Sequence, residues 1–155
     1  MNIKIRTAKI EDLPILLDFE QEIIKTEIPM DPTLITSKKI NYYDLSEYIK
    51  ADHTEVAVAE INGEIVGSGY GQIRDRKVFF KETAMGYIGF MFVKEDYRGM
   101  GVSQNIIKHL SDWFRSKNIY ELHLDVYDQN PRAIKAYEKA GFEKYLVKMR
   151  VNLKD

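Results

Sequence analysis

The stretch of sequence that decides the fold is residues 86–117, which read GYIGFMFVKEDYRGMGVSQNIIKHLSDWFRSK. Residues 86–93 are apolar on both alternating faces, which is typical of a strand covered on both sides of a sheet. Residues 103–117 carry apolar side chains at the spacing of a helix with one buried stripe: Ile106, Ile107, Leu110, Trp113 and Phe114. We therefore expect a strand at the centre of the sheet that passes through a glycine turn into a helix.

Weaker patterns on either side extend this unit to one α/β (α+β) domain over residues 1–155, with a mixed central sheet flanked by helices. The other expected elements are a strand at 3–7, helices at 11–25 and 33–50, a hairpin at 55–61 and 64–71, a strand at 120–126, a helix at 131–140 and a strand at 142–153. The hairpin turn, Asn62-Gly63, is a dipeptide that accepts positive φ at both positions.

Composition excludes several classes of function. Lys and Arg number 23 against 24 Asp and Glu, so a net charge of −1 supplies no general attraction to nucleic acid or an anionic membrane. The chain has no Cys, and its three His are scattered, so we expect no disulfide, no cysteine nucleophile and no metal site. Without a signal-peptide core or a run of 18 apolar residues, we expect a cytoplasmic protein without a membrane partner.

The glycine turn has the chemistry of an anion site. Gly99 and Gly101 lack Cβ, so backbone N–H groups there can approach a phosphate at the entrance of the following helix. Arg98 adds a positive charge, and Ser103 adds a hydroxyl donor or a helix cap. A plain tight turn is the alternative interpretation. No Lys follows the second glycine and no third glycine opens the helix, so the pattern is neither a P-loop nor a dinucleotide fingerprint.

A second segment, residues 130–142, reads NPRAIKAYEKAGF. Asn130 can cap a helix that begins at Pro131, and Gly141 can end it. The spacing of Ala133 and Tyr137 puts a small side chain and a phenol on one helical face. Tyr137 would otherwise be an ordinary core aromatic with a bonded hydroxyl.

Both segments resemble motifs of the GCN5-related N-acetyltransferase (GNAT) superfamily. Arg98-x-x-Gly101-x-Ser103 is similar to its pyrophosphate-binding motif, with Ser in place of the usual Gly or Ala, and residues 130–142 match its N-x-x-A-x-x-x-Y-x-x-x-G-F segment. The resemblance implies splayed parallel strands and acetyl-CoA as co-substrate without a metal. It implies that coenzyme A is held by Met91, Phe92, Val93, Arg98, Gly99, Met100, Gly101, Val102, Ser103, Asn130 and Ala133.

The resemblance also implies the catalytic residues. Tyr137 would protonate the coenzyme A thiolate as it leaves. Many members carry a glutamate as general base where this chain has Gly89. Others place an acid on the next strand, where this chain has Asp125, so Asp125 is the first candidate, against the alternative of a merely solvated carboxylate. His123, Tyr87 and Glu82 are weaker candidates.

We therefore expect direct attack of a primary amine on acetyl-CoA, because no Cys exists to carry an acetyl group. The acceptor is a small molecule or a peptide N-terminus, and a non-catalytic acyl-CoA sensor of the same fold is the alternative. Residues 20–49 and 74–83 should form the acceptor wall, which would include Glu20, Glu22, Glu27, Asp31, Tyr42, Tyr43, Tyr48, Phe79 and Phe80. The oligomeric state stays open, with a homodimer the commonest closed assembly.

Overall fold

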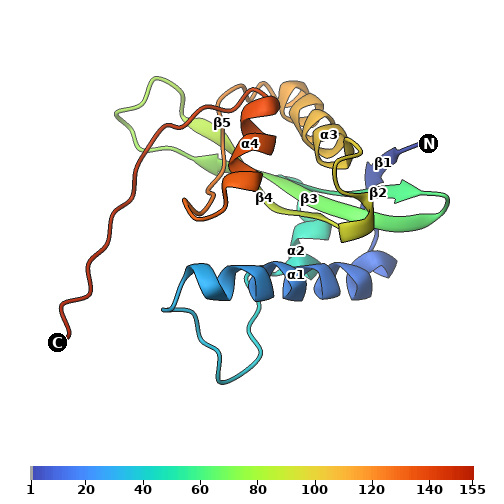
Figure 1. The fold of residues 1–155 in the computed structure, drawn as a ribbon. Coiled ribbons are helices and arrows are strands. Elements are labelled where there is room, and N and C mark those ends of the chain that lie inside the picture. Colours follow the sequence, from blue (N-terminus) through green and yellow to red (C-terminus); the bar gives the residue numbers. More distant parts are fainter. Residues whose placement is uncertain (1) are drawn as a thin grey trace.

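One five-stranded mixed sheet organises the protein, which a computed structural model describes for residues 2–155 (Figure 1). The strands lie in the order β1-β2-β3-β4-β5, and only the pair β4 and β5 is parallel. Their bounds are β1 Lys4–Thr7, β2 Thr54–Ile61, β3 Glu64–Asp75, β4 Ala84–Val93 and β5 Leu122–His123.

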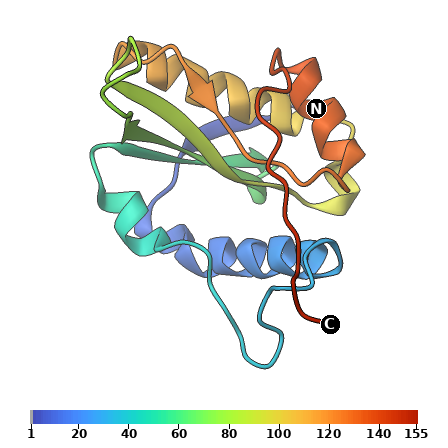
Figure 2. The ribbon, with the colours of Figure 1, turned by 90° about the vertical axis from the view of Figure 1, so that its left-hand side faces the viewer.

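Helices cover both faces of this sheet (Figure 2). One face carries α1 (Leu13–Glu27) and α2 (Leu45–Lys50), and the other carries α3 (Val102–Ser116) and α4 (Pro131–Lys139). Single 3-10 turns occupy Ile10–Asp12, Ile28–Met30 and Glu95–Tyr97. The single domain with a mixed sheet flanked by helices is therefore confirmed.

Two hydrophobic cores result from the alternation of side chains along the strands. In β2, Ala57 and Ala59 point into the core beneath α3, whereas Val56 and Val58 point into the core beneath α1 and α2. Phe114 fills the first core and Phe90 the second, both almost fully buried. Burial on both faces explains why β2, β3 and β4 are nearly continuously apolar.

The local signals place most elements correctly. The hairpin of β2 and β3 turns at Asn62 (φ 52°) and Gly63 (φ 80°), as predicted. The helix after the glycine turn begins one residue early, at Val102. The last helix ends as expected, since Gly141 has a φ of 100° that favours glycine.

Four expectations about the sheet and the helices are wrong, and three of them concern the position or the length of an element. The central strand is β3, and β4 is fourth of five, because strand order depends on long-range pairing that apolar content does not encode. The helix expected over 33–50 is only α2, since Asp44 caps it there by accepting a hydrogen bond from Glu47 N at 3.3 Å. The strand expected over 120–126 is only β5, because β4 pairs with it at two positions.

The strand expected over 142–153 is also absent from the structure. From Glu143 on this segment is exposed and forms no strand; it extends along one side of the molecule to the C-terminus, and Arg150 is paired with Asp31 at 2.7 Å (Figure 1). Its alternating apolar pattern is that of a strand, but a strand also needs a partner for its backbone groups, and the chain folds without providing one.

Candidate active site

The site lies where β4 and β5 separate. The two strands pair only at Gly86 with Leu122 and at Tyr87 with His123, and Gly86 N donates to Glu121 O at 2.8 Å. Beyond this point β4 continues to Val93, whereas β5 has ended. The expectation of splayed parallel strands is confirmed, and the backbone of residues 88–93 faces the opening without a β5 partner.

A bulge bends β4 inside this opening. Phe90 and Met91 together oppose Gly69 of β3, and Phe90 has a φ of 58°, which is rare for a bulky residue. The Ser68 hydroxyl donates to Phe90 O at 3.2 Å and so holds the bulge in place. Sequence reasoning missed it, because nothing local marks a phenylalanine for the left-handed region. Such strain is concentrated at functional sites.

The glycine turn joins the end of β4 to α3. Gly99 (φ 78°) and Gly101 (φ 86°) both adopt the left-handed conformation, and the first-turn N–H groups of α3 have no partner within the helix. Arg98 Nε donates to Val93 O at 3.0 Å, which ties the turn to β4. Gly101 is the N-cap, so Ser103 lies inside the helix and the helix-cap alternative for its hydroxyl is wrong.

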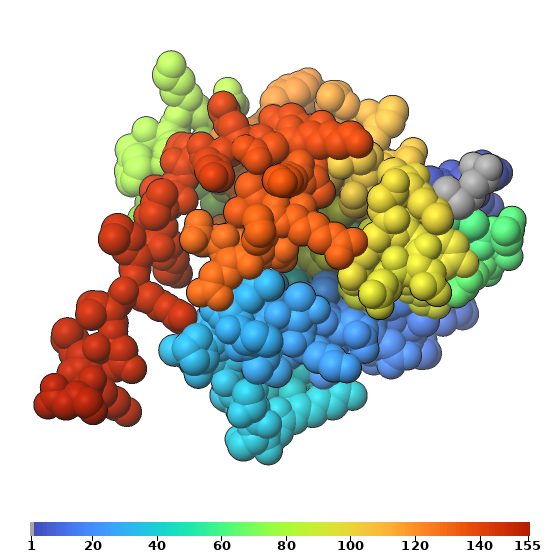
Figure 3. Space-filling view, in the orientation of Figure 1, coloured from blue at the N-terminus to red at the C-terminus, as the bar shows by residue number. Residues whose placement is uncertain are grey.

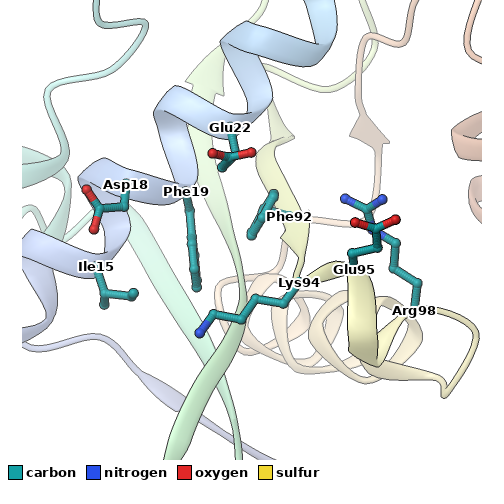
Figure 4. A pocket seen from close by; sticks show the side chains of 8 residues that line it. All are labelled: Ile15, Asp18, Phe19, Glu22, Phe92, Lys94, Glu95 and Arg98. Atoms are coloured by element: carbon teal, nitrogen blue, oxygen red, sulfur yellow. The ribbon is translucent and has the colours of Figure 1, made fainter.

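A hollow of about 300 Å³ lies beside this turn, between α1 and the end of β4 (Figure 4). The rings of Phe19 and Phe92 lie 4.6 Å apart in its wall. Its rim is charged, and the full lining is Ile15, Asp18, Phe19, Glu22, Phe92, Lys94, Glu95 and Arg98. Arg98 therefore belongs both to the turn and to the lining of the hollow.

Tyr137 lies on α4, which Asn130 caps by accepting a hydrogen bond from Ala133 N at 3.2 Å. Gln104 of α3 donates to Ala136 O at 3.0 Å and so fixes α4 against α3. Burial, with a smaller contribution from the charge of Glu27, raises the pKa of Tyr137 to about 12. The phenol therefore carries its proton at neutral pH, as a proton donor must.

Asp125 follows β5 and is linked to β4. The Tyr87 hydroxyl donates to Asp125 Oδ2 at 3.1 Å, and the Arg74 guanidinium lies 3.9 Å from the centre of the Tyr87 ring. Burial and the charge of Asp125 raise the pKa of Tyr87 above its usual value, so this phenol stays a hydrogen-bond donor. His123 is bound instead to Glu121, at 2.7 Å.

Tyr70 explains why no acidic side chain stands at position 89. A Cβ on Gly89 would lie 2.7 Å from Tyr70 Cζ, so the ring occupies the space that a side chain there would need. Arg74 donates weakly to the Tyr70 hydroxyl at 3.4 Å. Sequence reasoning did not include Tyr70, and it placed Arg74 only at the start of the connection over residues 74–83, although residues 70, 72 and 74 alternate onto one face of β3.

The expected acceptor wall is only partly assembled. Glu20 is completely buried and not on a surface: its Oε2 accepts from Tyr42 N at 2.8 Å and from Tyr43 N at 2.9 Å. It thereby fastens the segment before α2, and the Tyr43 ring packs edge-on against Tyr70 and Phe90. Glu82 lies in the exposed connection between β3 and β4.

The sequence model of the Acetyltransferase (GNAT) family matches residues 22–142 of this chain. A glucosamine 6-phosphate N-acetyltransferase of Trypanosoma brucei brucei is 33% identical over 100 residues, which cover 64% of this chain and 65% of that protein. An N-alpha-acetyltransferase of Sulfurisphaera tokodaii is 24% identical over 154 residues, which cover 93% and 82%.

The solved structure of a tetramutant protein from Bacillus halodurans has the same fold, with a TM-score of 0.85, 19% identity and coverage of 97% of this chain and 99% of that one. Within residues 2–155, no three His, Asp or Glu side chains gather as a metal site would require. Over the same range, no helix has both the length and the apolar character needed to cross a membrane.

Proposed function

Because the chain belongs to the GNAT family of acetyltransferases, we propose that it transfers an acetyl group from acetyl-CoA to a primary amine by direct attack. The observation that carries this proposal is the opening between β4 and β5, with an anion-binding turn at the end of β4 and a protonated phenol, Tyr137, on the helix that follows β5. Attack of an amine on the thioester of acetyl-CoA requires room for the cofactor's arm, a site for its pyrophosphate and a proton donor for the leaving thiolate, and these three features meet those requirements in that order.

The residues that would hold coenzyme A fit its chemistry. The free N–H groups at Gly101, Val102 and Ser103 offer donors to a pyrophosphate, and α3 adds the positive end of its dipole. Met91, Phe92 and Val93 lie on the part of β4 that has no β5 partner, so the amide-bearing arm can approach their backbone there, although Val93 O is already bound by Arg98. Arg98, Gly99 and Met100 complete the turn, and Asn130 and Ala133 line the start of α4.

Acetyl-CoA supplies the thioester carbonyl that the amine attacks. Asp125 accepts a proton from the acceptor ammonium, directly or through a water, and the Tyr87 hydroxyl holds its carboxylate in place. When the C–S bond breaks, Tyr137 donates its proton to the departing thiolate, the attacking nitrogen loses its second proton to solvent as the amide forms, and both Tyr137 and Asp125 then return to their starting protonation by exchange with solvent. The chain has no Cys, so no acetyl-cysteine intermediate intervenes.

The acceptor is a small molecule or a peptide N-terminus, and the names of the two curated relatives include one of each kind. Glu27 is half-buried near Tyr42 and has a raised pKa because burial disfavours its charge. Asp125 adds an exposed carboxyl group. These two carboxyl groups and the surrounding tyrosines favour a cationic amine.

A panel of amines and short peptides tests the proposal, with release of the coenzyme A thiol as the readout. Turnover that depends on one class of acceptor supports it and identifies the class. Tight binding of acetyl-CoA without thiol release on any acceptor contradicts it, and would instead favour the acyl-CoA sensor.

A further inference from the structure

Arg74 is a cation beside the candidate active site that no carboxylate of the chain neutralises. It lies near the end of β3 and is exposed, and within residues 2–155 no salt bridge includes it. The connection that follows β3 projects from the body, so the end of this strand lies at an outer corner of the molecule (Figure 3). Small molecules in solution can therefore reach the guanidinium.

Three side chains nevertheless hold this guanidinium in one orientation. Arg74 Nε donates to Gln72 Oε1 at 2.9 Å, and Arg74 Cζ lies over the Tyr87 ring, 3.9 Å from its centre. Gln72 is buried, and its own amide donates to Thr54 Oγ1 at 3.1 Å, which fixes the direction of its oxygen. The Tyr70 hydroxyl lies 3.4 Å from Arg74 Nη2. Ordering a long side chain costs conformational entropy, and here no ionic partner from the chain offsets that cost.

These contacts leave part of the guanidinium available for binding. Nε is bound to Gln72 and Nη2 is weakly bound to Tyr70, whereas Nη1 has no hydrogen-bond partner among residues 2–155. The contact with the Tyr87 ring uses the flat face of the group, and the N–H donors lie in its plane. Such a planar fork binds two oxygens of a carboxylate or a phosphate. Arg74 therefore has the properties of an anion-binding subsite.

Tyr87 connects this subsite with the candidate base. Arg74 lies over its ring, and its hydroxyl donates to Asp125 Oδ2 at 3.1 Å. The guanidinium and the carboxylate thus contact the same side chain without forming a salt bridge with each other, so their separation is set by one tyrosine. An amine that approaches Asp125 brings the group a few bonds from its nitrogen close to Arg74.

We propose that the acceptor carries an anionic group, a carboxylate or a phosphate, a few bonds from its amine, and that Arg74 binds this group. The inference rests on the proposed acetyl transfer. With the ammonium at Asp125 and the anion at Arg74, the acceptor has one orientation, which is the condition for efficient attack on the thioester. Two sources offer this chemistry: a small amino acid or phosphorylated amine, and a peptide whose first residue is acidic.

Acceptor pairs that differ in the anionic group test the subsite: β-alanine and its amide, phosphoethanolamine and ethanolamine, and a tripeptide that begins with Asp beside one that begins with Asn. Thiol release gives kcat/KM for each. We expect the wild type to prefer the anionic member of at least one pair by roughly 10- to 100-fold, because a charge-assisted hydrogen bond is lost in the other. The pair that responds identifies the source.

Variants assign this preference to Arg74. Arg74→Gln should lose the preference but retain the wild-type kcat/KM on the neutral members, and Arg74→Lys, which keeps the charge without the fork, should retain part of it. Arg115→Gln removes one positive charge from an exposed position of α3 and should keep the full preference. An Arg74→Gln enzyme that loses activity equally on both members of every pair would show a structural role only and overturn the proposal.

Calorimetric titration of the same pairs in the presence of coenzyme A measures binding without chemistry. Turnover of the acceptors with no preference in any pair, or a preference that survives Arg74→Gln, overturns the subsite and leaves the acetyl transfer standing. If no acceptor turns over, the acetyl transfer fails and the titration decides the subsite. Tighter binding of an anionic member that requires Arg74 then supports the subsite, and equal binding within every pair overturns it.

Discussion

At the scale of residues, the proposed mechanism depends on two hydroxyl groups with different roles. Tyr87 is a permanent donor that orients Asp125, since burial and the adjacent carboxylate both raise its pKa. Tyr137 is also protonated, because burial disfavours its phenolate, but the proposed chemistry requires it to give its proton away. Burial keeps the proton on the phenol but leaves the phenol a weaker acid than a thiol, whose ordinary pKa is about 8.5, so the transfer to sulfur has to accompany the breaking of the C–S bond.

Asp125→Asn tests the proposed base. The substitution keeps the size of the side chain but removes the charge that accepts a proton, so kcat/KM should fall by roughly 10²- to 10⁴-fold. The limb of the pH profile that belongs to this carboxyl should disappear. Glu121→Gln removes a neighbouring carboxylate and should preserve the profile. An Asp125→Asn enzyme with the wild-type rate and profile would reject Asp125 as base.

At the scale of elements, the turn between β4 and α3 contains two glycines, Gly99 and Gly101, that both adopt the left-handed conformation. Gly63, in the β2–β3 hairpin, adopts the same conformation. Neither Gly101 nor Gly63 has a backbone atom near enough to exclude a Cβ, so a side chain at either position costs mainly backbone strain. Only Gly101 lies at the N-terminus of a long helix. Substitutions at Gly101 and at Gly63 therefore separate the effect of backbone strain from the effect of blocking a ligand at a helix N-terminus.

Gly101→Val should weaken the binding of acetyl-CoA at least about 10-fold, or about 1.4 kcal/mol, because the side chain blocks the approach of the pyrophosphate to the backbone. Gly63→Val carries comparable strain and should bind normally. Isothermal titration of both variants, after their folding is verified, gives the comparison. Equal affinity of Gly101→Val and wild type would remove the turn from the cofactor site.

Elements with local signals were predictable, and those that depend on distant partners were not. Neighbouring residues alone predict three features that the structure contains: the helix over 103–117, the Asn62-Gly63 hairpin and the Asn130 cap. Packing between β3 and β4 produces the bulge at Phe90 and places Tyr70 beside Gly89, so no local sequence pattern predicted either feature. The alternating pattern of residues 142–153 predicted a strand, but the structure has no strand there because a strand also requires a pairing partner.

At the scale of the whole molecule, salt bridges connect the N-terminal strand, β1, to the elements beside it. Arg6 is bound to Asp12 at 2.8 Å and to Glu60 at 2.8 Å, which joins β1 to the start of α1 and to β2. The hydrogen bond from Arg6 lowers the pKa of Asp12 against the opposing effect of burial. Because the folded pKa is depressed, this pair stabilises the fold above the ordinary pKa of about 4 and ceases to do so as pH falls through the folded value.

Asp12→Asn should lower the free energy of unfolding by about 1 to 3 kcal/mol at pH 7, since it leaves Arg6 with a weaker partner. The difference from the wild type should shrink as pH falls below about 4, where the carboxyl of the unfolded chain becomes protonated, and should vanish once pH has passed the lower pKa of Asp12 in the folded protein. Asp112→Asn removes an exposed carboxylate of α3 and should cost less at every pH. Urea titrations at several pH values provide the measurement, and a difference that is constant with pH would contradict this account.

The most direct test of the proposed chemistry is the turnover of Tyr137→Phe at saturating acetyl-CoA and acceptor, measured by thiol release beside an equilibrium titration of acetyl-CoA. Tyr120→Phe, which removes an exposed phenol hydroxyl elsewhere, serves as the control. The account predicts that kcat of Tyr137→Phe falls by roughly 10²- to 10⁴-fold while its affinity for acetyl-CoA is unchanged, because the ring still packs and only the proton donor is lost. A Tyr137→Phe enzyme that releases thiol at the wild-type rate would contradict it.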